Sequence, residues 1–232
     1  MTVALLNEIG VMTAFEGNVI KVCHTELVSA SQLTVESDWS SASYWYSIIA
    51  LSEVGTQITL SSYKKNSLQG DSALVDIYKD FGVETTFNDD NSITISKTKN
   101  CQLSIVSYQL NNSPDIAQTI VVTCFGLGIG CDLSGLHTLK IKETDRLEAL
   151  KTELTKLGAH ILVTNDSLHL KSSATIKENV SIATYQDHRM AMAFAPLALK
   201  IPIFIQDAEV VSKSYPDFWK DLEHFGFSIS EV

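Results

Sequence analysis

The chain has 232 residues, 45% of them hydrophobic and 19% charged, a composition that is typical of globular proteins and excludes a fully disordered chain. The formal net charge of −10 disfavours both a nucleic-acid-binding face and a polybasic membrane patch. Apolar stretches such as residues 190–199 are shorter than the roughly 18 residues that a membrane-spanning helix needs. Because no basic and apolar leader opens the chain, we expect a cytoplasmic protein.

The first elements that we predict are a helix ending before Gly10 and an alternating strand over residues 11–15. A helix that is apolar nearly all round then begins at Asp38, and the strand TQITL follows it. An amphipathic helix ends before Gly82, and an Asn- and Asp-rich turn joins the strands VETTF and SITIS. The order is therefore apolar helix, strand, amphipathic helix and paired strands.

The same order returns twice further along the chain. Apolar helices begin at Asp115 and Asp187, amphipathic helices end before Gly158 and Gly226, and the further predicted strands are AHILV, SLHLK, IPIFI and FSIS. The glycines at matching places are separated by 72, 76 and 68 residues, and glycine there is a common left-handed helix end. Helices without a polar face should be buried, so we predict an α/β fold in which a threefold repeat places sheets outside and helices inside.

The opening copy of this repeat is incomplete. Met1 falls where the amphipathic helix of that copy should already be under way, so its apolar helix and first strand are missing. We therefore expect residues 1–37 to be the tail of a truncated upstream domain and residues 38–232 to form one complete domain. We also expect the parent protein to be longer.

Cations occur at three predicted helix starts. Arg146 lies in the first turn of an amphipathic helix, Arg189 lies two residues after the predicted cap Asp187, and Lys213 precedes the Ser-Tyr-Pro-Asp start of the last helix. A cation there opposes the helix macrodipole, whereas a bound anion is stabilised by it. We therefore predict that these starts surround an anion. The alternative is that the arginines only pair with Asp145 and Asp187.

Two carboxylates are candidates for acid and base chemistry. Asp115 is expected to open the second apolar helix, and Glu143 lies three residues before Arg146. The alternative is that each is an ordinary helix cap or surface acid. Along the helix that starts at Arg146, we predict an outward-facing ion pair between Glu153 and Lys156 opposite a leucine stripe.

The remaining motifs predict structure rather than chemistry. The glycine-rich residues 126–130 follow a helix and lack the spacing of a dinucleotide loop, so they predict a turn. His188 has no metal-ligand spacing to other histidines or cysteines, so we predict no metal site. We expect reduced thiols at all four cysteines, which are Cys23, Cys101, Cys124 and Cys131.

Six segments together resemble the EPSP synthase (3-phosphoshikimate 1-carboxyvinyltransferase) family. The most specific set is KETDR, DHRMA and KSYPD, and the family order also includes SDWSSASYWYSIIAL, KNSLQGD and SPDIAQT. The resemblance covers essentially all of residues 38–232. It implies a fold of two domains, each built from three βαβαββ units with buried helices in an inside-out barrel. This chain is accordingly identified as the C-terminal domain plus the end of the N-terminal one.

The resemblance implies transfer of the enolpyruvyl group of phosphoenolpyruvate to the 5-hydroxyl of shikimate 3-phosphate, with release of phosphate and without a cofactor. By motif match, Arg146, Arg189 and Lys213 bind phosphoenolpyruvate, and Lys142 helps to hold the shikimate side. The family often has Asn eight residues before its motif arginine, whereas this chain has Thr138, whose hydroxyl can still bond a substrate oxygen.

The resemblance also implies acid and base roles. Asp115 takes the proton of the 5-hydroxyl, Glu143 protonates the methylene carbon, and Lys213 also acts as an acid toward the leaving phosphate. The reaction is an addition followed by an elimination, so it needs acid and base groups on opposite faces of one carbon.

The site of this family lies between its two domains, so the expected partner of this chain is the missing N-terminal domain. We expect the chain alone to be inactive, the parent to be monomeric, and neither nucleic acid nor membrane to be a partner. One alternative is the related enolpyruvyl transferase acting on UDP-N-acetylglucosamine, which lacks the KETDR run. Another is a non-catalytic binding module that retains the fold.

Overall fold

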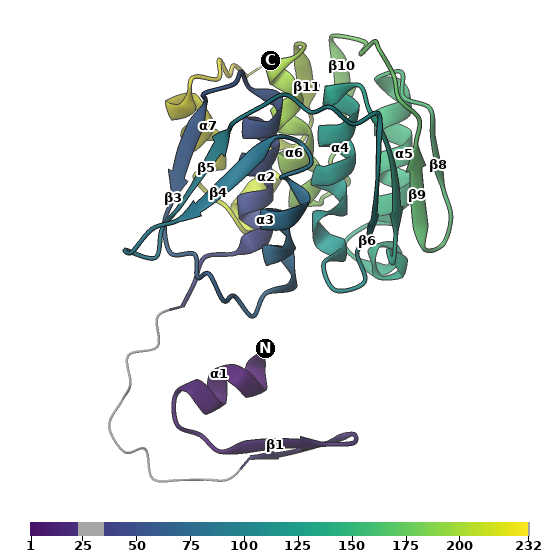
Figure 1. Ribbon diagram of the computed structural model, residues 1–232. Helices are drawn as coiled ribbons and strands as arrows, with labels where there is room; N and C mark the ends of the chain where they lie inside the picture. The colour runs from purple at the N-terminus through teal and green to yellow at the C-terminus, as the bar shows by residue number, and fades with distance from the viewer. Residues whose placement is uncertain (23–34, 232) are drawn as a thin grey trace.

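The computed structural model describes residues 1–22 and 35–231, and its architecture is α/β (Figure 1). Three largely buried helices stand in the middle of the body, namely α2 (Trp39–Leu51), α4 (Ala117–Leu127) and α6 (His188–Phe194). Within the described residues, the body has three sheets, of three, four and two strands, and they lie around these helices. This arrangement agrees with the predicted α/β fold.

The first sequence unit folds around α2, which begins where the sequence predicts, because the Asp38 carboxylate accepts the N–H of Ser40 at 2.9 Å. The elements that follow are β3 (Gln57–Leu60), the 3-10 turn η1 (Gly70–Ala73), α3 (Leu74–Ile77), β4 (Val83–Phe87) and β5 (Ile93–Lys97). The strands pair antiparallel in the order β3-β5-β4. Helix α3 is shorter than predicted, because the buried Tyr78 and Phe81 turn into the core through tight turns before Gly82.

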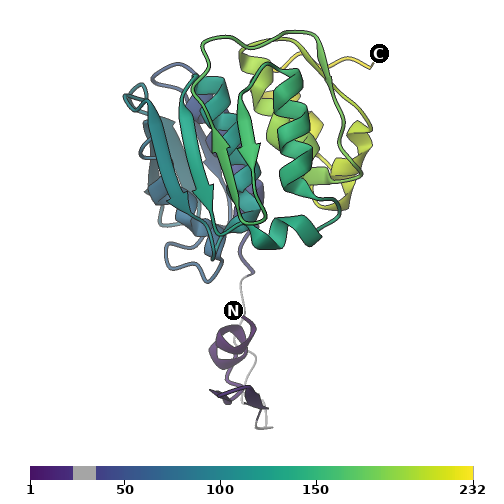
Figure 2. The ribbon, with the colours of Figure 1, turned by 90° about the vertical axis from the view of Figure 1, so that its right-hand side faces the viewer.

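The second unit has the full order of strand, helix, strand, helix and two strands. Its elements are β6 (Ile105–Gln109), η2 (Pro114–Ile116), α4, β7 (Gly130–Ser134), η3 (His137–Ile141), α5 (Arg146–Lys156), β8 (Ile161–Val163) and β9 (Ser167–Leu170). The sheet order is β6-β7-β9-β8, with β6 parallel to β7 and the other pairs antiparallel. Figure 2 turns this sheet toward the viewer. Gly128, at φ +75°, ends α4 and confirms the predicted turn.

The third unit begins with the same order. Its elements are β10 (Val180–Ile182), α6, the 3-10 helix η4 (Ala195–Leu199), β11 (Ile203–Ile205), η5 (Ala208–Lys213) and α7 (Phe218–Phe225). Strands β10 and β11 pair in parallel. The strand FSIS predicted after Gly226 is wrong, because no strand follows α7 in the described chain, which continues to residue 231. Gly226 ends α7 with φ +107°, as predicted for the glycine at this place.

Residues 1–22 form α1 (Thr2–Glu8) and the antiparallel pair β1 (Thr13–Glu16) and β2 (Val19–Val22). None of these residues is buried, and one contact with the body is the ion pair between Glu8 and Lys64, at 3.5 Å. The helix and strand predicted around Gly10 are therefore present. The assignment of residues 1–37 to an upstream domain stays a prediction.

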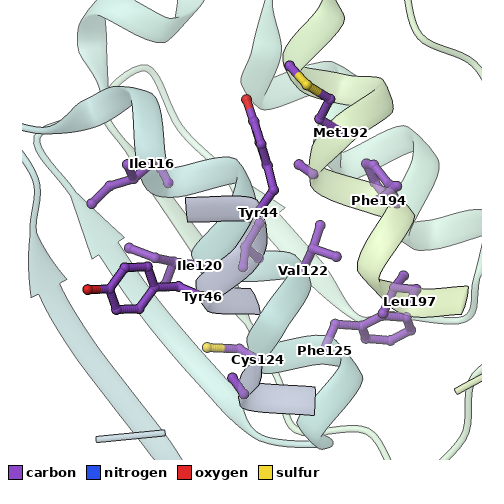
Figure 3. Packing of buried hydrophobic residues seen from close by; sticks show 14 of the residues in the cluster. Tyr44, Tyr46, Ile116, Ile120, Val122, Cys124, Phe125, Met192, Phe194 and Leu197 are labelled. Atoms are coloured by element: carbon purple, nitrogen blue, oxygen red, sulfur yellow. The ribbon is translucent and has the colours of Figure 1, made fainter. Parts of the chain in front are cut away.

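The core lies where the three central helices meet. Figure 3 shows Val122 and Phe125 of α4 turned toward Phe194 and Leu197, and all four are buried. On the side of α4 toward α2, the contact is polar, with the Ser43 hydroxyl 2.9 Å from that of Thr119. Small hydroxyl residues let the helix backbones approach closely while their buried hydroxyls remain hydrogen-bonded. The starts of α2, α4 and α6 are thereby held at fixed positions relative to one another.

One predicted surface feature is wrong. Glu153 of α5 is fully buried, so its ion pair with Lys156 does not face outward. Cys101, Cys124 and Cys131 carry free thiols, as predicted, whereas Cys23 lies outside the described residues. In the part of the chain that the structure describes, every helix is too short or too polar to cross a membrane.

Candidate active site

Arg146 is the centre of the candidate site. It is the first residue of α5, which begins at the cap Asp145, so the predicted helix start is confirmed. Its guanidinium is almost completely buried and contacts three carboxylates. Nε donates to Asp187 Oδ2 at 2.6 Å, Nη1 to Asp115 Oδ1 at 3.0 Å and Nη2 to Glu143 Oε2 at 2.7 Å. Three segments far apart in the sequence therefore meet at one side chain.

Asp187 links Arg146 to the next helix. It is fully buried, and its Oδ1 accepts the backbone N–H of Arg189 at 2.9 Å, so it caps α6 as predicted. Of the alternative pairs considered for the arginines, Arg146 does pair with Asp187. Asp145 instead pairs with Lys140, at 3.0 Å. The macrodipole cost of a cation at this helix start is thus offset by carboxylates of the chain itself.

Asp115 lies in η2, the turn that leads into α4, and its side chain does not cap that helix, so the alternative of an ordinary helix cap is wrong for Asp115. Its carboxylate is within 3.2 Å of Lys142 Nζ and 3.6 Å of Arg189 Nη2, in addition to Arg146. Burial tends to raise the pKa of the carboxyl, but the positive charges of the arginines and Lys142 outweigh it and hold the pKa below its ordinary value. Asp115 is therefore an ionised proton acceptor at neutral pH.

Glu143 lies at the mouth of the site, with its side chain 40% exposed. Burial again tends to raise the pKa of this carboxyl, but a backbone hydrogen bond and the charge of Arg146 lower it overall. In the ligand-free chain Glu143 is therefore an anion. It has to gain a proton before it can act as an acid.

Lys213 is not at a helix start, contrary to the prediction. It is the last residue of η5, and α7 begins only at Phe218. The Ser-Tyr-Pro segment continues the preceding turn, because the N–H groups of Ser214 and Tyr215 both bond the carbonyl of Val211. The ammonium of Lys213 nevertheless reaches the start of α6, where it donates to the Gln186 carbonyl at 2.7 Å.

Buried polar atoms without a hydrogen-bond partner gather at these helix starts. In the described ranges, the six such side-chain atoms are Gln118 Oε1 and Nε2, Thr138 Oγ1, Thr184 Oγ1, His188 Nδ1 and Arg189 Nη1. Unpaired buried groups are uncommon in folded proteins, and their clustering here suits a place that binds a ligand or ordered water. Thr138, predicted to face substrate, is one of them.

Sequence reasoning missed two residues beside this site. Gln118 is polar in the first turn of an otherwise apolar helix, three residues after Asp115, and that exception was its signal. Asp71, in the KNSLQGD segment, bonds Ser40 at the start of α2, and burial raises its pKa. Asp71 follows Gly70 in a polar segment, and that local pattern alone does not predict a site residue.

The site thus brings together four cations and three carboxylates, which are Lys142, Arg146, Arg189, Lys213, Asp115, Glu143 and Asp187. Arg146 is saturated by carboxylates, whereas Arg189 has an unpaired Nη1 and Lys213 is exposed. Fixed cations beside ionised carboxylates can bind an anionic substrate and exchange protons with it. Among the described residues, no group of His, Cys, Asp and Glu side chains is arranged to hold a metal ion.

Comparisons with known proteins show which family the chain is similar to. The family model for EPSP synthase (3-phosphoshikimate 1-carboxyvinyltransferase) matches residues 1–222. A 3-phosphoshikimate 1-carboxyvinyltransferase of Bacteroides fragilis is 40% identical over 99% of this chain and 56% of its own length. One of Syntrophobacter fumaroxidans is 33% identical over 96% and 52%. The chain spans about half the length of the curated relatives that it matches.

Solved structures agree in fold. The EPSP synthase of Acinetobacter baumannii superposes with a TM-score of 0.80 at 21% identity, over 97% of this chain and 54% of its own. The enolpyruvyl transferase NikO of Streptomyces tendae gives 0.69 at 16% identity, over 99% and 53%. At these identities the likeness concerns the fold alone.

Proposed function

The chain belongs to the EPSP synthase family, and from this premise we propose that it supplies one half of the active site of an enolpyruvyl transferase. The reaction is transfer of the enolpyruvyl group of phosphoenolpyruvate to the 5-hydroxyl of shikimate 3-phosphate, with release of phosphate. The observation that carries the proposal is the convergence of Asp115, Glu143 and Asp187 on Arg146, with Arg189 and Lys213 beside them.

Phosphoenolpyruvate binds, in this proposal, at the start of α6, where Arg189 lies in the first turn and Lys213 reaches the Gln186 carbonyl. Arg189 Nη1 is a buried donor without a partner, and Lys213 is exposed with its Nζ on a single backbone carbonyl. Phosphate and carboxylate groups are the anions that a guanidinium fork binds best. Lys142 and the unpaired hydroxyl of Thr138 then lie on the side of the acceptor alcohol.

Asp115 is the base that takes the proton of the 5-hydroxyl. Its lowered pKa keeps it ionised, and its three cationic neighbours fix its orientation. The same cations stabilise the negative charge that develops as the alcohol attacks.

Glu143 is the acid that protonates the methylene carbon, and substrate binding prepares it. In the ligand-free chain Arg146 holds Glu143 as an anion. An anionic substrate next to Arg146 competes for the guanidinium and adds negative charge, and both effects raise the pKa of the carboxyl. Lys213 is placed to donate a proton to the phosphate that leaves.

The other half of the site comes from a complementary domain, and residues 1–37 belong with it in this proposal. The hairpin of β1 and β2 exposes Phe15, Val19, Ile20 and Val22, each more than half exposed. Exposed apolar side chains of this kind gain free energy by packing against a partner. Because all four site cations already contact carboxylates or a carbonyl of the chain, we expect it to bind anions only weakly without that partner.

The test is phosphate release from shikimate 3-phosphate and phosphoenolpyruvate, measured with the chain alone and with the chain plus the N-terminal half of a family member. We expect turnover only with both halves. Lys213→Met should lower it, whereas Lys220→Met, at an exposed lysine that pairs only with Asp217, should not. Full turnover by the chain alone contradicts the half-site. Turnover with UDP-N-acetylglucosamine in place of shikimate 3-phosphate contradicts the assigned acceptor.

A further inference from the structure

Glu153 is a buried carboxylate outside the candidate site. It lies on α5, seven residues after Arg146, and is fully buried. Its Oε1 accepts the phenol of Tyr185 at 2.6 Å, and its Oε2 accepts the backbone N–H of Ala183 at 3.2 Å and the ammonium of Lys156 at 2.6 Å. Burying a charged carboxylate costs free energy unless several donors bond to it. Two of the three donors to Glu153 come from one loop.

That loop, residues 183–187, has a conformation that needs support. Tyr185 and Gln186 both have positive φ, at 55° and 58°, although neither is glycine. Each residue of this kind is disfavoured by about 1 to 2 kcal/mol relative to an ordinary backbone conformation. Two in succession persist only when the surrounding structure holds them. The bonds of Glu153 to Ala183 and Tyr185 are at the place where the loop leaves β10.

The same loop carries the groups that orient the candidate site. Its Gln186 carbonyl accepts Lys213 Nζ at 2.7 Å. Its Asp187 carboxylate holds Arg146 and caps α6 at the N–H of Arg189. A shift of the left-handed turn therefore moves the anchors of all three cations together.

We propose that Glu153 and Tyr185 form a clamp that positions the phosphoenolpyruvate-binding cations through the loop 183–187, an inference that rests on the function proposed above. The two residues touch no substrate and are positioning residues. Glu153 lies on α5 and bonds the loop before α6, so the clamp links the packing of α5 to the geometry of the start of α6.

The first experiment needs no activity. In this chain, Tyr185→Phe and Glu153→Gln should speed amide hydrogen exchange at Asp187 and Arg189 about tenfold, because the bonds of these amides depend on the loop. Amides in the middle of α4 should keep their rates. Glu148→Gln is the matched control, since this exposed residue of the same helix pairs only with Lys151. The phenol pKa of Tyr185, raised to about 12 by burial and by Glu153, should fall in Glu153→Gln. Unchanged exchange in both variants overturns the clamp.

The second experiment separates positioning from structure, and uses the assembled two-half enzyme. Tyr185→Phe should lower kcat/KM for phosphoenolpyruvate about tenfold and leave KM for shikimate 3-phosphate unchanged. Combined with Lys213→Met, it should lower kcat/KM by less than the product of the two single losses, because part of its effect acts through the anchor of Lys213. Additive losses, or faster exchange with unchanged kcat/KM, overturn the positioning role. If the unmodified enzyme releases no phosphate, the proposed function fails, while the exchange experiment still decides the clamp.

Discussion

The two ends of the buried helices differ in how their polar groups are paired. At or beside the starts of α4, α5 and α6 lie the two arginines, the three site carboxylates and five of the six unpaired buried polar atoms found in the described chain, the sixth being Thr138 Oγ1 in η3. At the far ends the backbone is satisfied. Lys97 donates to the carbonyl of Ala50 at the end of α2, and Gly128 ends α4 in a left-handed turn. Local rules of helix stability hold at one end and are violated at the other, and such violations are expected at functional sites.

The largest effect is expected from Arg146→Ala, at the charged end. The substitution leaves the fully buried Asp187 without its guanidinium partner, so the free energy of unfolding should fall by about 3 to 5 kcal/mol. Denaturant unfolding of the chain measures this. Lys140→Ala is the control, because its pair with Asp145 is partly exposed and should contribute less than about 1 kcal/mol. Equal losses of unfolding free energy in the two variants would show that the buried network around Arg146 contributes no more to stability than the partly exposed pair of Lys140 and Asp145.

Asp115→Asn should have the next largest effect, on catalysis rather than on folding. In the assembled enzyme the base is removed while its shape is kept, so kcat should fall about a hundredfold with little change in KM. Asp76→Asn, at an exposed carboxylate paired only with Lys79, should leave kcat unchanged. Because the pKa of Asp115 is lowered, the unmodified enzyme should lose its base only below the ordinary aspartate range. A kcat within threefold of the unmodified value would remove Asp115 from the base role.

Lys97→Met tests the far ends of the buried helices, where backbone carbonyls have hydrogen-bond partners. The ammonium of Lys97 is buried and donates to the carbonyls of Ala50 and Phe81, at 2.6 and 2.7 Å. Its loss leaves two acceptors unpaired, so unfolding should become easier by about 1 to 3 kcal/mol without a change in KM of the assembled enzyme. Lys99→Met, two residues on, is the control, because its side chain makes no hydrogen bond or ion pair with any residue that the structure describes.

The pH dependence of that stability has a definite sign. Burial lowers the pKa of Lys97, so the unfolded chain binds this proton more tightly than the folded chain does. The stability of the unmodified chain should therefore rise with pH between the lowered value and the ordinary 10.5, and fall back as the pH is lowered through this window. Lys97→Met should lack this component. A rise of the same size in both proteins would contradict it.

Local sequence signals were sufficient for two of the helix caps. Asp38 and Asp187 were predicted from an Asp before an apolar run, and both cap their helices. Lys97 could also have been found, because it follows Ile93 and Ile95 at the period of two that marks the buried face of β5. Which residues lie at helix starts, and with what charge, is local information that the sequence contains.

Contacts between distant segments could not be predicted. Glu153 and Lys156 have the spacing of an exposed helix pair, and only the loop at residues 183–185 makes that surface an interior. Lys213 precedes a Ser-Tyr-Pro segment typical of a helix start, yet the backbone bonds to Val211 continue the earlier turn. A tertiary contact overrides the local pattern at Glu153, and a local backbone turn overrides it at Lys213.

The smallest effect is expected from Gly126→Ala, where the far ends of α2, α4 and η4 meet. A methyl group there would lie 2.8 Å from Leu51 Cδ2 and 3.0 Å from Leu197 Cδ2, so both leucine side chains have to move. That strain is offset by the roughly 1 kcal/mol by which alanine is favoured over glycine within a helix, so the net change should stay within about 1 kcal/mol. Gly70→Ala is the contrasting variant near the starts, because its methyl group would lie 1.9 Å from the backbone oxygen of Asn112, which cannot turn aside. Denaturant unfolding should therefore separate the two variants widely. Equal destabilisation would mean that the far ends are packed as rigidly as the starts.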